Sequence, residues 1–292
     1  IKNINIESSE NSIKDVTSLT NSLDYNLSRY IFYSQIKKGL VNFKLDAQFD
    51  PIEEKINSYL ISGTVKDANF NLVGKGSLDN INFNFISKDK LTKISNLNFG
   101  FQGLNLLSKN IEIKSEKSGE YFINGDVEND KKLINPNIIF KLINIKQDFL
   151  SRRDISLQSK NFFSFSLIKY KLKNLKIDSI INFDEIYFKN QYLNLIVLKK
   201  GTINSRYENN KFNADIVSNF AFSKKLKSNN DYKNNKLQLS LKRKKNQNIE
   251  IIGNIKNEKT LLNSKILLNL LKFNPNLLSN ENVNIETDNK FT

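Results

Sequence analysis

The residues of this chain that could carry out chemistry are two pairs of adjacent carboxylates, Glu53-Glu54 and Asp184-Glu185. A pair of carboxylates can divide the roles of general acid and general base. Neighbouring residues of a β-strand, however, point to opposite faces, and no further group of ionisable side chains accompanies either pair. The sequence therefore predicts no catalytic residues.

The chain has 292 residues and contains neither His nor Cys. His is the commonest general base and metal ligand, and disulfides and thiolate ligands need Cys. Triads of the Ser-His-Asp kind, zinc hydrolase motifs and disulfides are therefore excluded. We expect no enzyme activity, no metal and no cofactor.

Two glycine-containing motifs have a structural interpretation. Gly74-Lys75-Gly76 is weakly similar to a phosphate-binding loop, but the Gly-Lys-Ser/Thr that should follow is missing, so it predicts a hairpin turn. Asn124-Gly125-Asp126 predicts a turn as well, and not a calcium loop. Gly63 and Gly125 also lie in strand-like segments, where a missing Cβ indicates a β-bulge, so Gly125 has two structural interpretations.

The net charge of +15 arises from 45 Lys and Arg against 30 Asp and Glu. Nucleic-acid binding would need these charges clustered in a patch, whereas the Lys residues are scattered and alternate with apolar residues. We therefore expect no nucleic-acid partner. Two short basic clusters, Arg152-Arg153 and Lys242 to Lys245, are either solubilising loop residues or contacts for anionic head groups.

Apolar residues alternate with polar ones at a period of two, which predicts β-strands with one apolar and one polar face. Turn signals separate the alternating segments at intervals of about 10–20 residues, as in an antiparallel meander. The turn signals are Gly74 to Gly76, Ser87 to Lys90, Lys117 to Glu120, Asn129 to Lys132, Glu208 to Lys211 and Asn229 to Asp231. The residues predicted to line the apolar face are Ile81, Phe83, Phe85, Leu97, Phe99, Phe101, Ile111, Ile113, Phe163, Phe165, Leu167, Phe212, Ile216, Leu237 and Leu239.

Three segments depart from this alternation and predict short helices, or alternatively buried strands: Pro51 to Tyr59, Pro136 to Phe149 and Thr260 to Leu271. No Pro- or Gly-rich linker marks a domain boundary. We expect one continuous segment over residues 1–292, with a soft break at the Asn- and Lys-rich loop Ser223 to Asn235. Because the chain begins at Ile1 and contains no Met, we expect it to be a piece of a longer protein.

A sheet with one apolar face must cover that face. Two packed sheets, a sheet closed on itself, or an open gutter with an apolar lining would each do so. Long helices that could cover a sheet are scarce, and the apolar side chains are large, with 21 Phe. The sequence therefore predicts an all-β fold with a few short helices, an extended, twisted antiparallel meander curled into an open, taco-like groove. Acyl chains are the natural occupant, since each buried CH₂ gains roughly 0.8 kcal/mol.

Particular segments resemble the repeating strands of the AsmA-like superfamily, of the TamB and YhdP type. They are Tyr59 to Leu72 (YLISGTVKDANFNL), Gly76 to Phe85 (GSLDNINFNF), Leu97 to Phe101 (LNFGF), Ile111 to Lys114 (IEIK) and Tyr121 to Val127 (YFINGDV). The resemblance covers residues 55 to 130 most clearly and extends more loosely to about residue 255.

The resemblance implies a periplasmic protein of Gram-negative bacteria that is anchored in the inner membrane by a segment outside this chain. It implies a bridge-like conduit that moves phospholipid between the inner and outer membranes, with acyl chains in the groove and partner proteins in either membrane. The alternative is a structural or adhesive sandwich or solenoid with a filled core. A solenoid predicts a fixed-period repeat, and the sequence has none.

Overall fold

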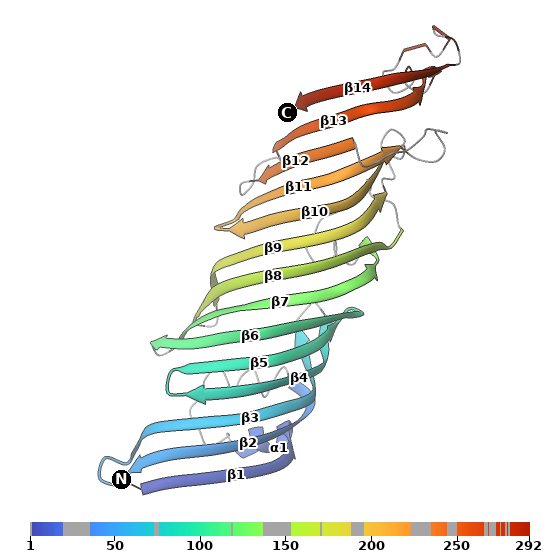
Figure 1. Ribbon diagram of the computed structural model, residues 1–292. Coiled ribbons are helices and arrows are strands. Elements are labelled where there is room, and N and C mark those ends of the chain that lie inside the picture. Colours follow the sequence, from blue (N-terminus) through green and yellow to red (C-terminus); the bar gives the residue numbers. More distant parts are fainter. Residues whose placement is uncertain are drawn as a thin grey trace. The chain divides into compact units, whose positions relative to one another are not determined.

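The computed structural model describes residues 2–19, 36–72, 76–117, 119–136, 153–169, 171–187, 196–222, 235–243, 250–265, 268, 273–274, 276–277, 279 and 281–292. Within these ranges almost all of the chain is β-strand, and α1 (Ile13–Leu19) is a helix of two turns. The all-β prediction with few helices is confirmed (Figure 1).

The described residues form one sheet of fourteen strands whose spatial order is their order in the sequence. Neighbouring strands are antiparallel, and the sheet does not close on itself. The predicted antiparallel meander is thus confirmed. The strands are β1 (Lys2–Ser12), β2 (Ile36–Asp50), β3 (Lys55–Leu72), β4 (Gly76–Lys88), β5 (Leu91–Phe101), β6 (Leu104–Lys117), β7 (Glu120–Ile134), β8 (Ile155–Ile168), β9 (Lys171–Tyr187), β10 (Ile196–Glu208), β11 (Lys211–Phe222), β12 (Asn235–Arg243), β13 (Glu250–Asn263) and β14 (Asn282–Phe291).

The contacts divide the chain into two compact units. Unit 1 comprises Ile1–Asp130 and Lys160–Ile177, and unit 2 comprises Lys131–Ser159 and Asp178–Thr292. The division passes through β7, β8 and β9, so each of these strands contributes residues to both units. The loop Ser223 to Asn235 lies outside the described residues, apart from Asn235 itself at the start of β12.

Several predicted turns connect adjacent strands. Asp89-Lys90 and Asn209-Asn210 are two-residue hairpin turns, and Asp89, Asn209 and Asn210 have positive φ angles of 50°, 51° and 60°. Asn and Asp tolerate this conformation better than other residues with a Cβ. Gly119 (φ +76°) is the second residue of the two-residue turn between β6 and β7. The strand β4 follows β3 after the loop predicted at Gly74 to Gly76, most of which lies outside the described residues.

Two other turn predictions are wrong. Asn124-Gly125-Asp126 and Asn129 to Lys132 both lie inside β7, and not between strands. Gly125 pairs there with Ile111 of β6, so cross-strand pairing overrides the local turn preference of Asn, Gly and Asp. The turn predicted at Asn229 to Asp231 lies outside the described residues.

The first of the three helix predictions is wrong. Pro51 to Tyr59 is not a helix: Asp50 pairs with Lys55, and the chain reverses through a four-residue turn between β2 and β3. The Asp50 carboxylate accepts the backbone N–H of Ile52 at 2.9 Å, the same bond that it would make as a helix cap. Asp50 therefore makes the capping hydrogen bond that the sequence predicts, but it caps a turn and not a helix.

The helix predicted for Thr260 to Leu271 is wrong in its first part, because Thr260 to Asn263 belong to β13 and pair with β14. Ser264, Lys265 and Leu268 are helical, and the other residues of that segment lie outside the described ones. Pro136 is helical, but the remainder of the segment Pro136 to Phe149 also lies outside the described residues.

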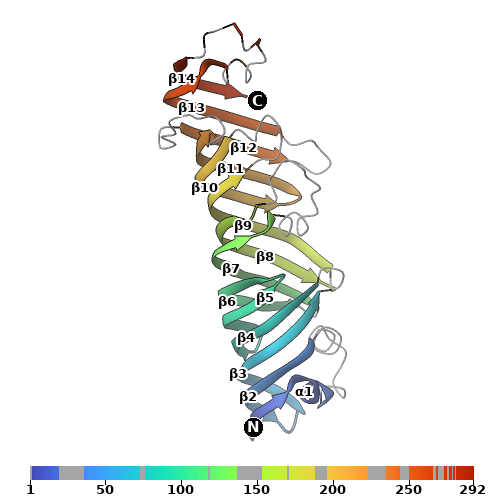
Figure 2. The same cartoon turned by 90° about the vertical axis from the view of Figure 1, so that its right-hand side faces the viewer.

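The hydrophobic core of unit 1 lies where α1 packs on the sheet. Ile13 from α1 joins Val41 of β2 and Val65 and Ala68 of β3 in a buried cluster. Around it pack Val16 of α1 and three residues of β4, namely Ile81, Phe83 and Phe85. Figure 2 shows α1 beside the first strands of the sheet.

Candidate functional site: one apolar face in each unit

The strand register places the eight candidates of β4, β5 and β6 on one face of unit 1. Residues directly opposite each other on paired antiparallel strands share a face. Phe85 pairs with Ile94, Ile94 with Ile111, and further pairs join Phe101 to Leu78 and Phe99 to Leu106. We call this side the apolar face of unit 1; its predicted members are Ile81, Phe83, Phe85, Leu97, Phe99, Phe101, Ile111 and Ile113.

The strand β8 extends this set. The Phe163 ring lies over Gly125, next to Ile111, and the Phe163 and Phe165 rings stack with centroids 6.0 Å apart. Leu167 continues the same alternation along β8. All eleven of these candidates in unit 1 are half-buried, so each still exposes part of its side chain.

In β4, β5 and β6, charged side chains lie off the apolar face of unit 1. By register, the residues of β4, β5 and β6 on that face are apolar, Ser, Thr or Gly. On the opposite side, Lys93 of β5 and Glu112 of β6 form an ion pair of 3.3 Å. A face of this composition offers dispersion contacts and no electrostatic partner.

Glycines on the apolar face provide room for aromatic rings. A Cβ on Gly63 would lie closest to the Asn42 carbonyl oxygen and 2.9 Å from Cζ of Phe85. One on Gly125 would lie 2.8 Å from Cγ1 of Ile111 and 3.1 Å from Cζ of Phe163. Both glycines pair regularly with their neighbours, Gly63 with Phe43 and Phe85, and Gly125 with Ile111. Neither is a bulge, so that prediction is wrong; each glycine leaves space for a ring from the next strand.

The bulges lie at other residues. Asp67 in β3, Asn80 in β4 and Asn96 in β5 have positive φ angles of 50°, 53° and 52°, and the register shifts beside each of them. A fourth shift lies in β6 between Leu107 and Ile111. A bulge bends its strand and increases its twist. Four consecutive strands of unit 1 therefore each carry a bend.

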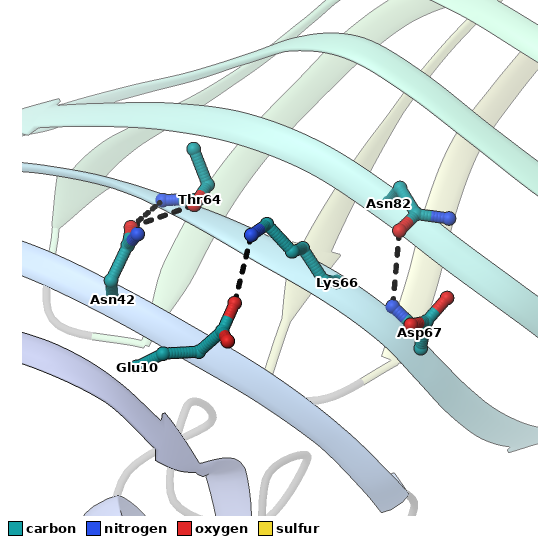
Figure 3. A network of polar contacts seen from close by, with 6 residues as sticks. All are labelled: Glu10, Asn42, Thr64, Lys66, Asp67 and Asn82. Carbon is teal, nitrogen blue, oxygen red and sulfur yellow. Dashed lines mark hydrogen bonds and ion pairs between the residues drawn. The ribbon is translucent and has the colours of Figure 1, made fainter.

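The opposite side of β1 to β4 carries a network of polar contacts, as Figure 3 shows. The Asn42 side-chain oxygen accepts both the backbone N–H and the hydroxyl of Thr64, at 3.1 and 2.6 Å. Asn82 accepts the backbone N–H of Asp67 at 3.0 Å and so holds the bulge in β3. We call this side the polar face of unit 1; it also exposes apolar side chains, among them Ile86 and Leu107.

Two further contacts continue the polar face. Asn82 donates to the Asn98 side-chain oxygen of the next strand at 3.1 Å. Lys66 donates to Glu10 at 2.8 Å, and this bond raises the pKa of the Lys66 ammonium group. The polar face therefore links β1, β3, β4 and β5 through side-chain hydrogen bonds.

Unit 2 has an apolar face of its own. Ile216 of β11 pairs with Leu239 of β12, and Leu237 pairs with Ser218 and Ile255, so these positions share a face with Phe212 and Ala214. Leu237 is buried, Ile216 and Leu239 are half-buried, and Phe212 is 37% exposed. The buried Phe183 ring lies on Gly201 of β10, on the same face as Ile203 and Ile216.

The adjacent carboxylates Asp184 and Glu185 bind different partners in unit 2. Asp184 bonds to Lys131 at 2.7 Å, which lowers the pKa of its carboxyl group. Glu185 accepts from Lys199 and from the Tyr187 hydroxyl, which lowers the Glu185 pKa, while burial opposes this. A general acid at neutral pH needs a raised carboxyl pKa, and these two are shifted the other way. In the other pair, Glu53 forms an ion pair with Lys55 in the turn region.

The basic clusters are only partly within the described residues. The Arg153 guanidinium lies 4.5 Å from the centroid of the Tyr187 ring, a cation–π contact. Lys242 and Arg243 are exposed at the end of β12, where Lys242 lies opposite Glu250. Arg152, Lys244 and Lys245 lie outside the described residues.

Sequence reasoning missed α1, which turns out to contact the apolar face. The sequence contains a signal for this helix, because Asp15 follows Ser12 by three residues, the spacing of a capping box. In the structure Ser12 accepts the Lys14 backbone N–H at 3.2 Å. Ile13 and Val16, three residues apart, form its apolar side.

Within the part of the chain that the structure describes, no three Asp or Glu residues are grouped so as to hold a metal ion. No helix in that part is long and apolar enough to span a membrane. Comparison of the chain with protein-family models, with curated proteins and with solved structures gives no match.

Proposed function

We propose that this chain is a segment of a periplasmic lipid conduit that moves phospholipid between the inner and outer membranes. In this proposal the acyl chains lie along the apolar faces of the two units. A segment outside this chain anchors the protein in the inner membrane, in keeping with the resemblance to AsmA-like proteins. The chain itself performs no chemical reaction.

One observation carries the proposal: the large apolar residues of β4, β5 and β6 share one face by register, and they remain half-exposed there. All fourteen described strands belong to one sheet, so no second described sheet packs on this face. Contiguous exposed apolar surface is typical of binding surfaces. A filled sandwich would instead require a second layer of strands.

The chemistry of the face fits hydrocarbon chains. An alkyl chain gains roughly 0.8 kcal/mol for each CH₂ that leaves water and needs no polar partner. The apolar positions of β4, β5 and β6 supply Phe, Ile and Leu in successive strands, without a charge that would have to lose its hydration. A cargo of this kind could move along the face without breaking specific bonds.

The bulges support a curled sheet in unit 1. Each bulge bends its strand, and β3, β4, β5 and β6 each carry one. We propose that these bends curl the sheet so that the apolar face becomes the lining of an open groove. The polar face, with its cross-strand hydrogen bonds, would then face solvent.

Mass spectrometry of co-purified lipid, combined with site-specific photocrosslinking, tests the proposal. The matched positions are Phe99, on the apolar face, and Asn98, its neighbour on the polar face. We expect phospholipid to crosslink from Phe99 and not from Asn98. A protein that purifies without lipid, or labels equally from both positions, would instead favour a structural β-protein with a filled core.

A further inference from the structure

The helix α1 occupies part of the apolar face of unit 1. Its Ile13 side chain is 3% exposed and contacts the cluster of Val41, Val65 and Ala68. Those sheet residues share their face with Phe83, because Val65 pairs with Phe83 and with Val41. The alkyl side chain of Ile13 therefore lies where the proposed function would place hydrocarbon.

The sheet provides a seat of matching shape for Ile13. A Cβ on Gly39 would lie 2.7 Å from Cδ1 of Ile13 and 2.8 Å from Cβ of Ala68. Gly39 also has a φ of +142°, a conformation that residues with a side chain rarely adopt. Two small residues in contact, Gly39 and Ala68, thus leave the space that Ile13 fills.

We infer that α1 is the resident occupant of the apolar face over β2, β3 and β4, and that it excludes lipid from this part of unit 1. This inference rests on the proposed function and adds where the cargo site begins. Ile81, Phe83 and Phe85 pack against the α1 cluster and belong to the core of unit 1. Hydrocarbon binding then begins at β5, with Leu97, Phe99 and Phe101.

Covalent attachment favours α1 over a free ligand. Ile13 directly follows Ser12, the last residue of β1, so no linker separates the helix from the strand. A group tethered this closely has an effective concentration in the millimolar range or above, far higher than that of a lipid monomer in water. The helix therefore keeps its seat while lipid moves on the strands beyond it.

The inference can be tested on the unmodified protein with a phospholipid that carries a diazirine in its acyl chain. The probe is included in vesicles of phosphatidylethanolamine and phosphatidylglycerol, and labelled peptides are identified after trypsin digestion. Cleavage at lysines separates β4, in the peptide Gly76 to Lys88, from β5 and the start of β6, in the peptide Ile94 to Lys109. We expect labelling of the β4 peptide to be at least about tenfold weaker, as for a site held closed by one buried aliphatic side chain.

The variant Ile13→Asp should open the seat, because a carboxylate there would be buried without a partner. Labelling of the β4 peptide should then rise to the level of the β5–β6 peptide. Lys14→Asp places the same side chain on the exposed side of α1 and should leave the labelling pattern unchanged. Circular dichroism shows whether each variant keeps its strand content.

The outcomes separate the two proposals. Equal labelling of both peptides in the unmodified protein overturns the role of α1 and leaves the lipid conduit standing. A folded Ile13→Asp protein whose β4 peptide stays unlabelled also overturns it. Absence of label from both peptides in every variant overturns the proposed function itself. If Ile13→Asp does not fold, Ile13→Ala replaces it, with the same rise expected in smaller amount.

Discussion

The contact between Phe183 and Gly201 in unit 2 gives the most quantitative prediction. A Cβ on Gly201 would lie 2.6 and 2.8 Å from Cε1 and Cε2 of Phe183, and closer still to its Cζ. The Phe183 side chain is only 4% exposed, so its ring has little room to move away. Gly201→Ala should therefore overpack this site.

The expected magnitude follows from two opposing effects. Overpacking a buried site typically costs about 1–3 kcal/mol. Replacing Gly by Ala within a strand returns roughly 0.5–1 kcal/mol, because Gly loses more backbone entropy on folding. We expect Gly201→Ala to lower the free energy of unfolding by about 1–2 kcal/mol.

The effect of Gly201→Ala on the free energy of unfolding should change sign once the Phe183 ring is removed. Phe183→Ala alone should cost about 3–5 kcal/mol, as for other buried Phe residues. In that background a Cβ on Gly201 meets no ring, and Gly201→Ala should stabilise the protein by roughly 0.5–1 kcal/mol. The coupling energy of the double-mutant cycle is then about 1.5–3 kcal/mol.

Urea titration followed by far-ultraviolet circular dichroism measures this cycle, with the slope m compared among all four proteins. Equal slopes show that the variants unfold to similar denatured states. If Gly201→Ala has the same effect in both backgrounds, the ring does not lie on the glycine, and the interpretation of Gly63 with Phe85 and Gly125 with Phe163 loses its support as well.

Three further predictions address the two faces and the ion pairs. Phe99→Asp should abolish lipid crosslinking while strand content is kept, and Asn98→Asp should leave crosslinking unchanged; retention of lipid by folded Phe99→Asp would argue against the apolar face as the binding surface. Asn82→Ala removes the acceptor of the Asp67 N–H and should cost about 1 kcal/mol in urea titrations, whereas Asn84→Ala, on the same face of the same strand, should cost much less. The pKa of Glu185 is lowered, first because Lys199 donates a hydrogen bond to its carboxylate, so this carboxylate stabilises the fold at neutral pH and the stabilisation is lost as the pH falls below about 4.3. Acid should therefore destabilise the unmodified protein more than the Glu185→Gln variant. An identical pH profile of stability for the two proteins would contradict this.

The alternation of apolar and polar residues predicted most of the fold. Period-two patterns identified strands at Ile81 to Phe85 and Leu97 to Phe101, and the turn at Asn209-Asn210 gave the hairpin between β10 and β11. These signals are local, since a strand residue and its turn are neighbours in sequence. The same locality explains why eight predicted positions in β4, β5 and β6 share one face by register.

The errors arose where the outcome depends on a distant partner. Asp50 can accept N–H groups in a helix cap or in a tight turn, and only the pairing of β2 with β3 decides between them. The residues around Gly125 predict a turn. In the structure Gly125 lies in a strand, and the ring of Phe163, 38 residues further along the chain (163 minus 125), lies on it. The short helix α1 is stabilised by its seat on β2 and β3, and not by its own length.

The identity of spatial and sequence order has a consequence for how this chain can change in length. Every interior strand that the structure describes pairs only with the strands that precede and follow it, so these strands behave as a one-dimensional array of nearest neighbours. Deleting two consecutive strands, such as β5 and β6, would bring together β4 and β7, which already run in opposite directions. Evolution could thus shorten or lengthen the protein one hairpin at a time, whereas losing a single strand would place two parallel strands side by side without the long crossover that they need.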